Sequence, residues 1–185
     1  MLNKLLLQSS QSLFVIIDMQ VKLAPAMELA AMQAVTKNCA ILLQAANLMQ
    51  VPTLATEQYP QGLGETLPAL KQYFLYTKSI KKTAFSACAE PAFKELLPVD
   101  KLQIMLAGME AHICVLQTAL DLLQANKQVF LVEDAVISRN STNKANAIAR
   151  LRDAGCIIIN TESVLFEWLG NANHAAFKAV SALIK

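Results

Sequence analysis

Short apolar runs recur along the chain, and each ends at a polar or turn-forming residue. The first run, Leu13 to Ile17, ends at Asp18 and is typical of a buried strand in a parallel sheet. A second run begins at Val51-Pro52, where the proline is tolerated because it opens the strand. Four further strands are predicted, at residues 74–80, 102–107, 128–132 and 156–159.

Helical spacing fills the intervals between these runs. Apolar residues recur at alternating steps of three and four between Met32 and Met49, which predicts a helix with one apolar stripe, for the core or an oligomer interface. Ser141 or Thr142 can cap a helix that runs to Ala154, where Gly155 suits a left-handed C-terminal position. Other helices are expected from near Glu90 and over 112–126, 164–169 and 172–184, with a long loop at 57–68.

Strands that alternate with helices predict a three-layer αβα domain. We expect a mainly parallel, Rossmann-like sheet of six strands with helices on both faces, and one domain over residues 1–185. Ligands of such folds bind at the carboxyl ends of the strands. Asp18, the residues after Thr56 and after Ile80, and the segment 108–114 all lie at such ends.

Composition narrows the function classes. Hydrophobic residues make up 55% of the 185 residues, yet no apolar run reaches the roughly 18 residues of a membrane span. Residues 1–12 make a poor signal peptide, so we expect a cytosolic protein without a membrane partner. The net charge of +2, with basic and acidic residues interspersed, argues against a nucleic-acid partner.

The cysteines and glycines carry no metal or cofactor signature. Four cysteines are far apart without a C-x-x-C pair, and the chain has two histidines, so we expect reduced thiols and no metal. Gly62 and Gly64 lack the spacing of a dinucleotide-binding loop, and we expect no cofactor. Cys39 and Cys156 suit the core, while Cys88 is ambiguous.

Cys114 follows Gly108 at the transition from a strand to a helix. A thiolate in the first turn of a helix meets free N–H groups and the positive end of the dipole, which lower its pKa. The same N–H groups could form an oxyanion hole. The alternative is an ordinary buried cysteine, and position alone does not decide between the two.

Asp18 and a lysine near the third strand could complete such a site. Asp18 could act as a general base for the thiol, although strand-end acids also satisfy turns or cap helices. A lysine beside both groups would stabilise their negative charges, but the pattern does not separate Lys82 from Lys81. His112 is two positions from Cys114, so their side chains diverge by about 200° on a helix, which favours a pocket role for His112 over a proton relay.

Three motifs together resemble the isochorismatase-like cysteine hydrolase superfamily. They are "VIIDMQ" around Asp18, "KKTAFSA" around Lys82 and "AGMEAHICV" around Cys114. The family places its lysine three residues before an aromatic-Ser pair, which selects Lys82 ahead of Phe85-Ser86. The resemblance covers nearly the whole chain and is strongest to isochorismatase-domain-containing hydrolases without an assigned substrate.

The resemblance implies a mechanism and a set of site residues. Asp18 would deprotonate Cys114, which would attack an amide-like carbonyl to give a thioester that water then hydrolyses, with Lys82 stabilising the charges. It also implies a cis peptide at Met109–Glu110, with the backbone N–H groups of Glu110 and Cys114 as the oxyanion hole. Candidate pocket residues are Gln20, Glu57, Tyr59, Phe85 and His112.

Two departures from the family's pattern restrict the substrate. Nicotinamidases of the superfamily bind a metal through histidines, whereas the matching "TEQYPQGLGET" has none, which disfavours a metal and nicotinamidase activity. The presence of Cys114 favours cleavage of a small amide or ureido C–N bond over a vinyl ether.

Two competing hypotheses remain for the function: a non-catalytic scaffold on the same fold, and a thiol redox or stress protein. We also expect a homo-oligomer, dimer or larger.

Overall fold

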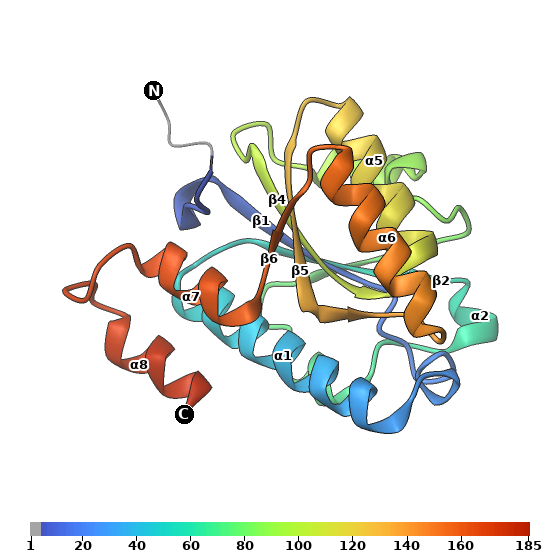
Figure 1. Ribbon diagram of the computed structural model, residues 1–185, viewed down its shortest axis with the longest axis horizontal. Helices are drawn as coiled ribbons and strands as arrows, with labels where there is room; N and C mark the ends of the chain where they lie inside the picture. The colour runs from blue at the N-terminus through green and yellow to red at the C-terminus, as the bar shows by residue number, and fades with distance from the viewer. Residues whose placement is uncertain (1–4) are drawn as a thin grey trace.

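The computed structural model describes residues 5–185 and contains one six-stranded, all-parallel sheet (Figure 1). The strand order is β3-β2-β1-β4-β5-β6, so the chain begins at the centre, winds to one edge, crosses back and winds to the other. Ligand sites in doubly wound sheets lie where this order reverses, here between β1 and β4. The strands are β1 (Ser12–Ile17), β2 (Thr53–Gln58), β3 (Lys78–Lys82), β4 (Gln103–Met109), β5 (Gln128–Ile137) and β6 (Ile157–Ile159).

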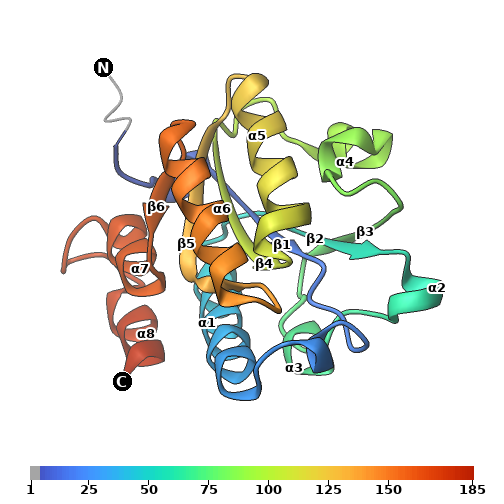
Figure 2. The same ribbon diagram turned by 45° about the vertical axis from the view of Figure 1, so that its right-hand side comes forward.

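Helices cover both faces of this sheet. Figures 1 and 2 show α1, α7 and α8 on one face and α5 and α6 on the other. The predicted three-layer αβα fold with six parallel strands is therefore confirmed. The helices are α1 (Leu29–Leu48), α2 (Pro60–Leu63), α3 (Pro68–Lys71), α4 (Pro91–Leu96), α5 (Leu116–Gln124), α6 (Ser141–Asp153), α7 (Thr161–Leu169) and α8 (Phe177–Ser181).

The central strand β1 divides its side chains between two apolar clusters. Phe14 and Ile16 point into the cluster formed with α1 and α7, whereas Leu13, Val15 and Ile17 point into the cluster formed with α5. This division follows from the alternation of side chains along a strand, and both faces are buried because helices cover them. Burial on both faces fixes β1, and with it the position of the residue that follows Ile17.

The helical stripe between Met32 and Met49 belongs to the core of the protein. Most of its residues are buried in the cluster beneath the sheet, and Met49 is partly buried against it. Between the two readings of this stripe, core and oligomer interface, the packing of α1 supports the core. The stripe residues buried in this cluster are Met32, Val35, Cys39, Leu42 and Ala46.

Several element boundaries differ from the predictions. The strand expected at 74–80 runs over Lys78–Lys82, because the preceding residues form turns. The C-terminal helix expected over 172–184 is limited to α8 and a 3₁₀ turn at Ala182–Ile184. Asn140 caps α6 by accepting a hydrogen bond from the Thr142 N–H, so the prediction of Ser141 or Thr142 as the cap is wrong.

Other predictions concern the ends and extent of the chain. Gly155 has a positive φ of 95° after α6, as predicted. In the described range 5–185, no helix combines the length and apolar character that crossing a membrane requires. The predictions of one domain and of a poor signal peptide include residues 1–4, which lie outside the described residues, and both stay predictions.

Candidate active site

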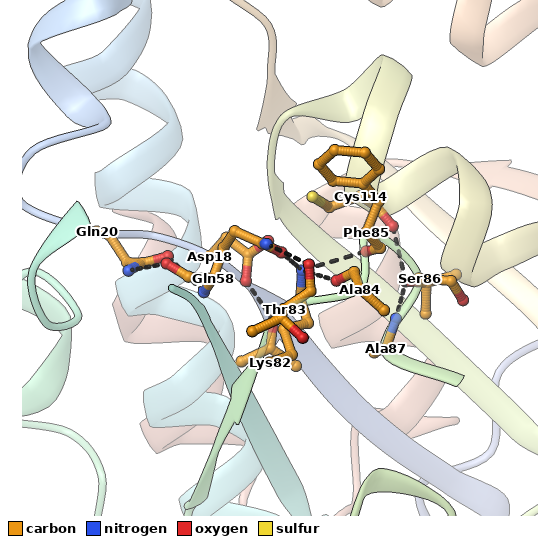
Figure 3. A network of polar contacts seen from close by, with 12 residues as sticks. Asp18, Gln20, Gln58, Lys82, Thr83, Ala84, Phe85, Ser86, Ala87 and Cys114 are labelled. Carbon is orange, nitrogen blue, oxygen red and sulfur yellow. Dashed lines mark hydrogen bonds and ion pairs between the residues drawn. The ribbon is translucent and has the colours of Figure 1, made fainter. Parts of the chain in front are cut away.

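Three side chains predicted from separate parts of the sequence meet at the carboxyl edge of the sheet. Asp18 follows β1, Lys82 ends β3 and Cys114 lies in the turn after β4. The Asp18 Oδ2 and Lys82 Nζ atoms are 2.8 Å apart, and both side chains have no solvent exposure. Figure 3 shows the Cys114 side chain next to this network, and both Asp18 and Lys82 act on the pKa of its thiol. A buried ion pair therefore lies beside a cysteine.

Asp18 is held in place by β2, the strand next to β1 on the side away from β4. Its backbone has a φ of 50°, and its N–H donates to the Thr56 carbonyl at 3.1 Å. The Thr56 hydroxyl donates to Asp18 Oδ1 at 2.7 Å, which leaves Oδ2 for Lys82. Asp18 Oδ1 is thus engaged by a fixed donor, and the charged interaction is made by the other oxygen.

Gly108 allows β1 and β4 to approach closely just below the site. It has a φ of 119°, and a Cβ at this position would lie 2.0 Å from the Ile17 carbonyl oxygen. No larger residue fits without a shift of one backbone against the other. Because Ile17 precedes Asp18 and Gly108 precedes the turn that carries Cys114, this contact sets the spacing between the two.

Lys82 is enclosed by acceptors. Besides Asp18, its ammonium donates to Gln58 Oε1 at 2.5 Å, to the Phe85 carbonyl at 3.1 Å and to the Ala84 carbonyl at 3.3 Å. The adjacent Lys81 points to solvent, because neighbouring residues on a strand face opposite sides. The structure therefore distinguishes the two lysines and places Lys82, not Lys81, against Asp18.

Cys114 lies in a π-helical turn, Ala111–Val115, that leads into α5. Burial, followed by the charge of Asp18, raises the pKa of the thiol to about 12, while Lys82 acts in the opposite direction. The prediction of a lowered thiol pKa is therefore wrong, because desolvation and the neighbouring carboxylate outweigh the favourable charges. At neutral pH the thiol keeps its proton, so a reaction at sulfur requires a base.

The peptide bond Met109–Glu110 is cis, as the resemblance implied. Glu110 then precedes the π-helical turn, and its carbonyl accepts hydrogen bonds from the N–H groups of Ile113 at 3.1 Å and Val115 at 3.3 Å. These bonds hold the turn in which Cys114 lies. The assignment of the Glu110 and Cys114 N–H groups to an oxyanion hole stays a prediction.

His112 belongs to a separate polar network. Its Nδ1 is 3.0 Å from the Ser138 hydroxyl and 3.4 Å from Glu110 Oε2, and its Nε2 is 3.4 Å from Asn143 Nδ2. These contacts connect His112 to the segment that follows β5 and to α6, and they agree with the helix-geometry argument against a Cys/His proton relay. A pocket role for His112 stays a prediction.

The other four pocket candidates fall into two groups. Gln20 and Glu57 are buried and bonded within the protein; Glu57 Oε1 accepts from both the N–H and the hydroxyl of Thr66. Tyr59 and Phe85 are each 55% exposed, on the segments that follow β2 and β3. The first group is suited to supporting loops, and the second to contacting a ligand.

Two residues of the network were absent from the predictions, namely Thr56 and Gln58. Both lie at the end of β2, next to β1 in the sheet, and Thr56 pairs with Ile17 in the strand register. The rule that ligands bind at strand ends pointed to the residues after Thr56, but it did not identify these two side chains. Knowledge that β2 adjoins both β1 and β3 would have pointed to them.

The remaining cysteines are free thiols that make no contact with the Asp18 or Lys82 side chains in the hydrogen bonds and ion pairs of residues 5–185. Cys39 and Cys156 are buried, and Cys88 is half-buried. Burial raises the pKa of all three, to about 12 for Cys156 and about 11 for Cys88. Among residues 5–185, no three His, Cys, Asp or Glu side chains form a group that could hold a metal ion.

Comparison with known proteins yields matches over most of the chain. Residues 12–163 match the isochorismatase domain model. The isochorismatase domain-containing protein 2 of Danio rerio is 38% identical over 179 residues, covering 96% of this chain and 89% of that protein.

Solved structures show the same architecture. The MAR1 ribonuclease of Caenorhabditis elegans is 35% identical with a TM-score of 0.91, and the match covers 96% of this chain and 91% of that one. The YcaC gene product of Escherichia coli, described as an octameric hydrolase of unknown specificity, shares the fold at 22% identity with a TM-score of 0.89. That match covers 97% of this chain and 89% of the YcaC chain.

Proposed function

Because this chain belongs to the isochorismatase family, we propose that it is a hydrolase with a cysteine nucleophile, acting on a small amide or ureido C–N bond. The observation that carries this proposal is the buried Asp18–Lys82 ion pair beside Cys114, a protonated thiol. If Cys114 were a purely structural residue, the neighbouring carboxylate would contribute nothing to it except a higher thiol pKa. The pairing is therefore better explained by proton transfer between the two groups.

In the first half-reaction, Asp18 accepts the thiol proton as the sulfur attacks the carbonyl carbon. The carbonyl oxygen takes up the negative charge, which the backbone N–H groups of Glu110 and Cys114 would stabilise. When the tetrahedral intermediate collapses, the C–N bond breaks and Asp18 returns the proton to the leaving nitrogen. The amine departs, and a thioester remains on Cys114.

In the second half-reaction, Asp18 accepts a proton from water, and the resulting hydroxide attacks the thioester carbon. The C–S bond then breaks, the acid is released, and the sulfur recovers the proton from Asp18. The two halves together consume one water molecule and leave the enzyme unchanged. Asp18 acts first as a base and then as an acid in each half.

Lys82 supplies a fixed positive charge through both halves. The negative charge moves from the Asp18 carboxylate to the sulfur and back, and Lys82 interacts with both groups. Its ammonium is fully buried, where water screens charges less than at the surface. We therefore assign it electrostatic stabilisation rather than proton transfer.

The exposed rings of Tyr59 and Phe85 support a small substrate with an apolar portion. The C. elegans relative is described as a ribonuclease, but the +2 net charge with interspersed signs favours a small neutral molecule over RNA for this chain. We also infer a cytosolic location and a homo-oligomeric state. Exposed apolar side chains on helices, such as Leu29 and Phe166, support the oligomer. A scaffold or a thiol redox protein would not require Asp18 and Lys82 together.

The test is turnover of an amide and ureido panel by wild type, Cys114→Ala and Cys114→Ser, with product acids detected by mass spectrometry. Cys88→Ala is the matched control, because this half-buried thiol lies outside the ion-pair network. We expect turnover in wild type and in the control and none in either Cys114 variant. Wild-type turnover that persists in both Cys114 variants would refute the nucleophile, and a peroxide adduct without any acyl adduct would favour the redox protein.

A further inference from the structure

The Lys82 ammonium has more acceptors than protons. It carries three N–H donors and faces Asp18 Oδ2, Gln58 Oε1 and the carbonyls of Ala84 and Phe85. Three of these four acceptors are neutral and keep their character whatever the protonation state of Asp18. Gln58 Oε1 is the one neutral acceptor that comes from a side chain, and it makes the shortest of the four contacts.

The orientation of the Gln58 amide is fixed by its second group. Its Nε2 donates to the Thr83 carbonyl at 2.8 Å, so its oxygen is left to face Lys82. Gln58 and Lys82 are also paired in the register of β2 and β3, which brings the two side chains to the same face of the sheet. The amide is thus oriented by the strand and by the loop that follows β3 (Figure 3).

Gln20 holds the backbone of Gln58. Its side-chain amide is fully buried and makes both hydrogen bonds of the Gln58 backbone: Nε2 donates to the Gln58 carbonyl at 3.0 Å, and Oε1 accepts from the Gln58 N–H at 2.8 Å. The Gln20 Nε2 also donates to the Gly64 carbonyl at 2.6 Å. Gln20 is thus a buried support for the end of β2, and its predicted role in lining the pocket stays a prediction.

We propose that Gln58 is a positioning residue of the reaction: its amide oxygen holds the Lys82 ammonium in place while the proton moves between Cys114 and Asp18, and Gln20 holds Gln58. The proposal rests on the proposed function. When Asp18 becomes neutral, its attraction for Lys82 weakens and the thiolate attracts the ammonium instead. The neutral oxygen of Gln58 keeps the ammonium between the two groups in both states.

The test uses alkylation of Cys114 by iodoacetamide between pH 5 and pH 10, followed by mass spectrometry of the Cys114 peptide. This readout needs no substrate. Iodoacetamide reacts with the thiolate, so the alkylation rate follows the small fraction of Cys114 that has lost its proton and should rise with pH across this range. At a given pH, the rate therefore reports how well Lys82 stabilises the thiolate.

Titratable groups near the pair must be accounted for in this range. Asp18, Lys82 and Cys114 face one another, and Glu90, at the start of α4, also interacts with Lys82. Hydrogen bonds from the backbone N–H groups of Thr83 and Ala84, followed by the charge of Lys82, hold the pKa of Glu90 below its usual value. Glu90 therefore stays ionised from pH 5 to pH 10 and contributes no inflection.

Two variants separate positioning from structural support. Gln58→Met removes the acceptor without adding charge, and Gln58→Glu keeps an acceptor but adds a negative charge next to Lys82. Gln72→Met and Gln72→Glu are matched controls on an exposed glutamine with one local hydrogen bond, to the Ala69 carbonyl. Thermal melting of each variant establishes that it is folded.

We expect Gln58→Glu to lower the alkylation rate about tenfold or more at each pH, because a second carboxylate near Lys82 disfavours the thiolate and one pKa unit is a tenfold change. Gln58→Met should lower the rate by less, because the ammonium loses an acceptor but no negative charge is added, and the Gln72 controls should match wild type. Folded Gln58 variants that are alkylated at or above the wild-type rate would overturn the positioning role, because a merely loosened structure exposes the thiol and speeds the reaction. Wild-type Cys114 that is never alkylated would instead refute the proposed function itself.

Discussion

Replacing Asp18 by Asn separates the base from its position. Asn has the same shape as Asp and tolerates the positive φ of 50° at this residue. The substitution keeps an acceptor oxygen and removes the charge and the basicity. Thr56 can still donate to the amide oxygen, so the local hydrogen bond at Oδ1 is preserved.

The expected loss of rate follows from the protonation state of the thiol. Burial and the charge of Asp18 raise the pKa of Cys114 to about 12, so nearly all of the thiol keeps its proton at pH 7. Hydrolysis at neutral pH therefore depends on proton transfer to Asp18, and removing such a base costs about 10²- to 10⁴-fold in rate. The same change lowers the thiol pKa below that value, because the charge of Asp18 is one cause of its rise.

Hydrolysis and alkylation should therefore respond differently to Asp18→Asn. Turnover of the amide substrate should fall by about 10²- to 10⁴-fold. Alkylation of Cys114 should instead be faster than in wild type at each pH between 5 and 10, because the carboxylate that helps to raise the pKa of the thiol is gone. A folded Asp18→Asn protein with more than half of wild-type turnover would refute the assignment of Asp18 as the base.

Stability provides an internal control. Asp18→Asn leaves the Lys82 ammonium buried without its counter-ion, which should lower the free energy of unfolding by about 3–5 kcal/mol. The double variant Asp18→Asn/Lys82→Met removes both charges and should recover much of this loss without recovering turnover. Urea unfolding measures both. Full recovery of turnover in the double variant would contradict the mechanism.

Three more predictions follow from neighbouring contacts. Thr56→Val removes the donor to Asp18 Oδ1 and should cost about 1.5–3 kcal/mol in urea unfolding; an unchanged midpoint would contradict the importance of that bond. Gly108→Ala should lower the free energy of unfolding by more than about 3 kcal/mol, because its Cβ meets the Ile17 carbonyl at a positive φ; wild-type stability would contradict the close approach. Burial raises the pKa of Cys156 from 9.0 to about 12, so the folded state retains this proton and loses stability as pH rises above 9; Cys156→Ala should remove about 1 kcal/mol of that loss at pH 10, and an equal loss in both proteins would refute it.

Hydrophobic periodicity was sufficient to predict the fold. Apolar runs specified the central strands most clearly, because β1 and β4 are buried at every position, whereas the edge strand β3 is mostly exposed. The stripe on α1 specified its contact with the sheet. Boundaries failed where the local sequence was ambiguous: Phe74 and Tyr76 resemble strand residues, yet they lie in the turns before β3. Strand order is determined by long-range packing, which a single sequence does not display.

The site could be predicted only in part. Asp18 and the cysteine turn were found at strand ends, and the choice of Lys82 over Lys81 came from the family motif. The thiol pKa was predicted with the wrong sign, because the helix terminus was considered without the burial and the Asp18 carboxylate that surround Cys114. Gln58 was overlooked because its role depends on the adjacency of β2 and β3.

The central claim is that Cys114 forms a thioester with the acyl part of the substrate. The most direct measurement is an acid quench during turnover of an amide from the panel, followed by mass spectrometry of the intact protein and of the Cys114 peptide. The account predicts an added mass equal to the substrate without its amine, located on Cys114 and released by hydroxylamine. Turnover without any such adduct, together with full activity of Cys114→Ala, would contradict it.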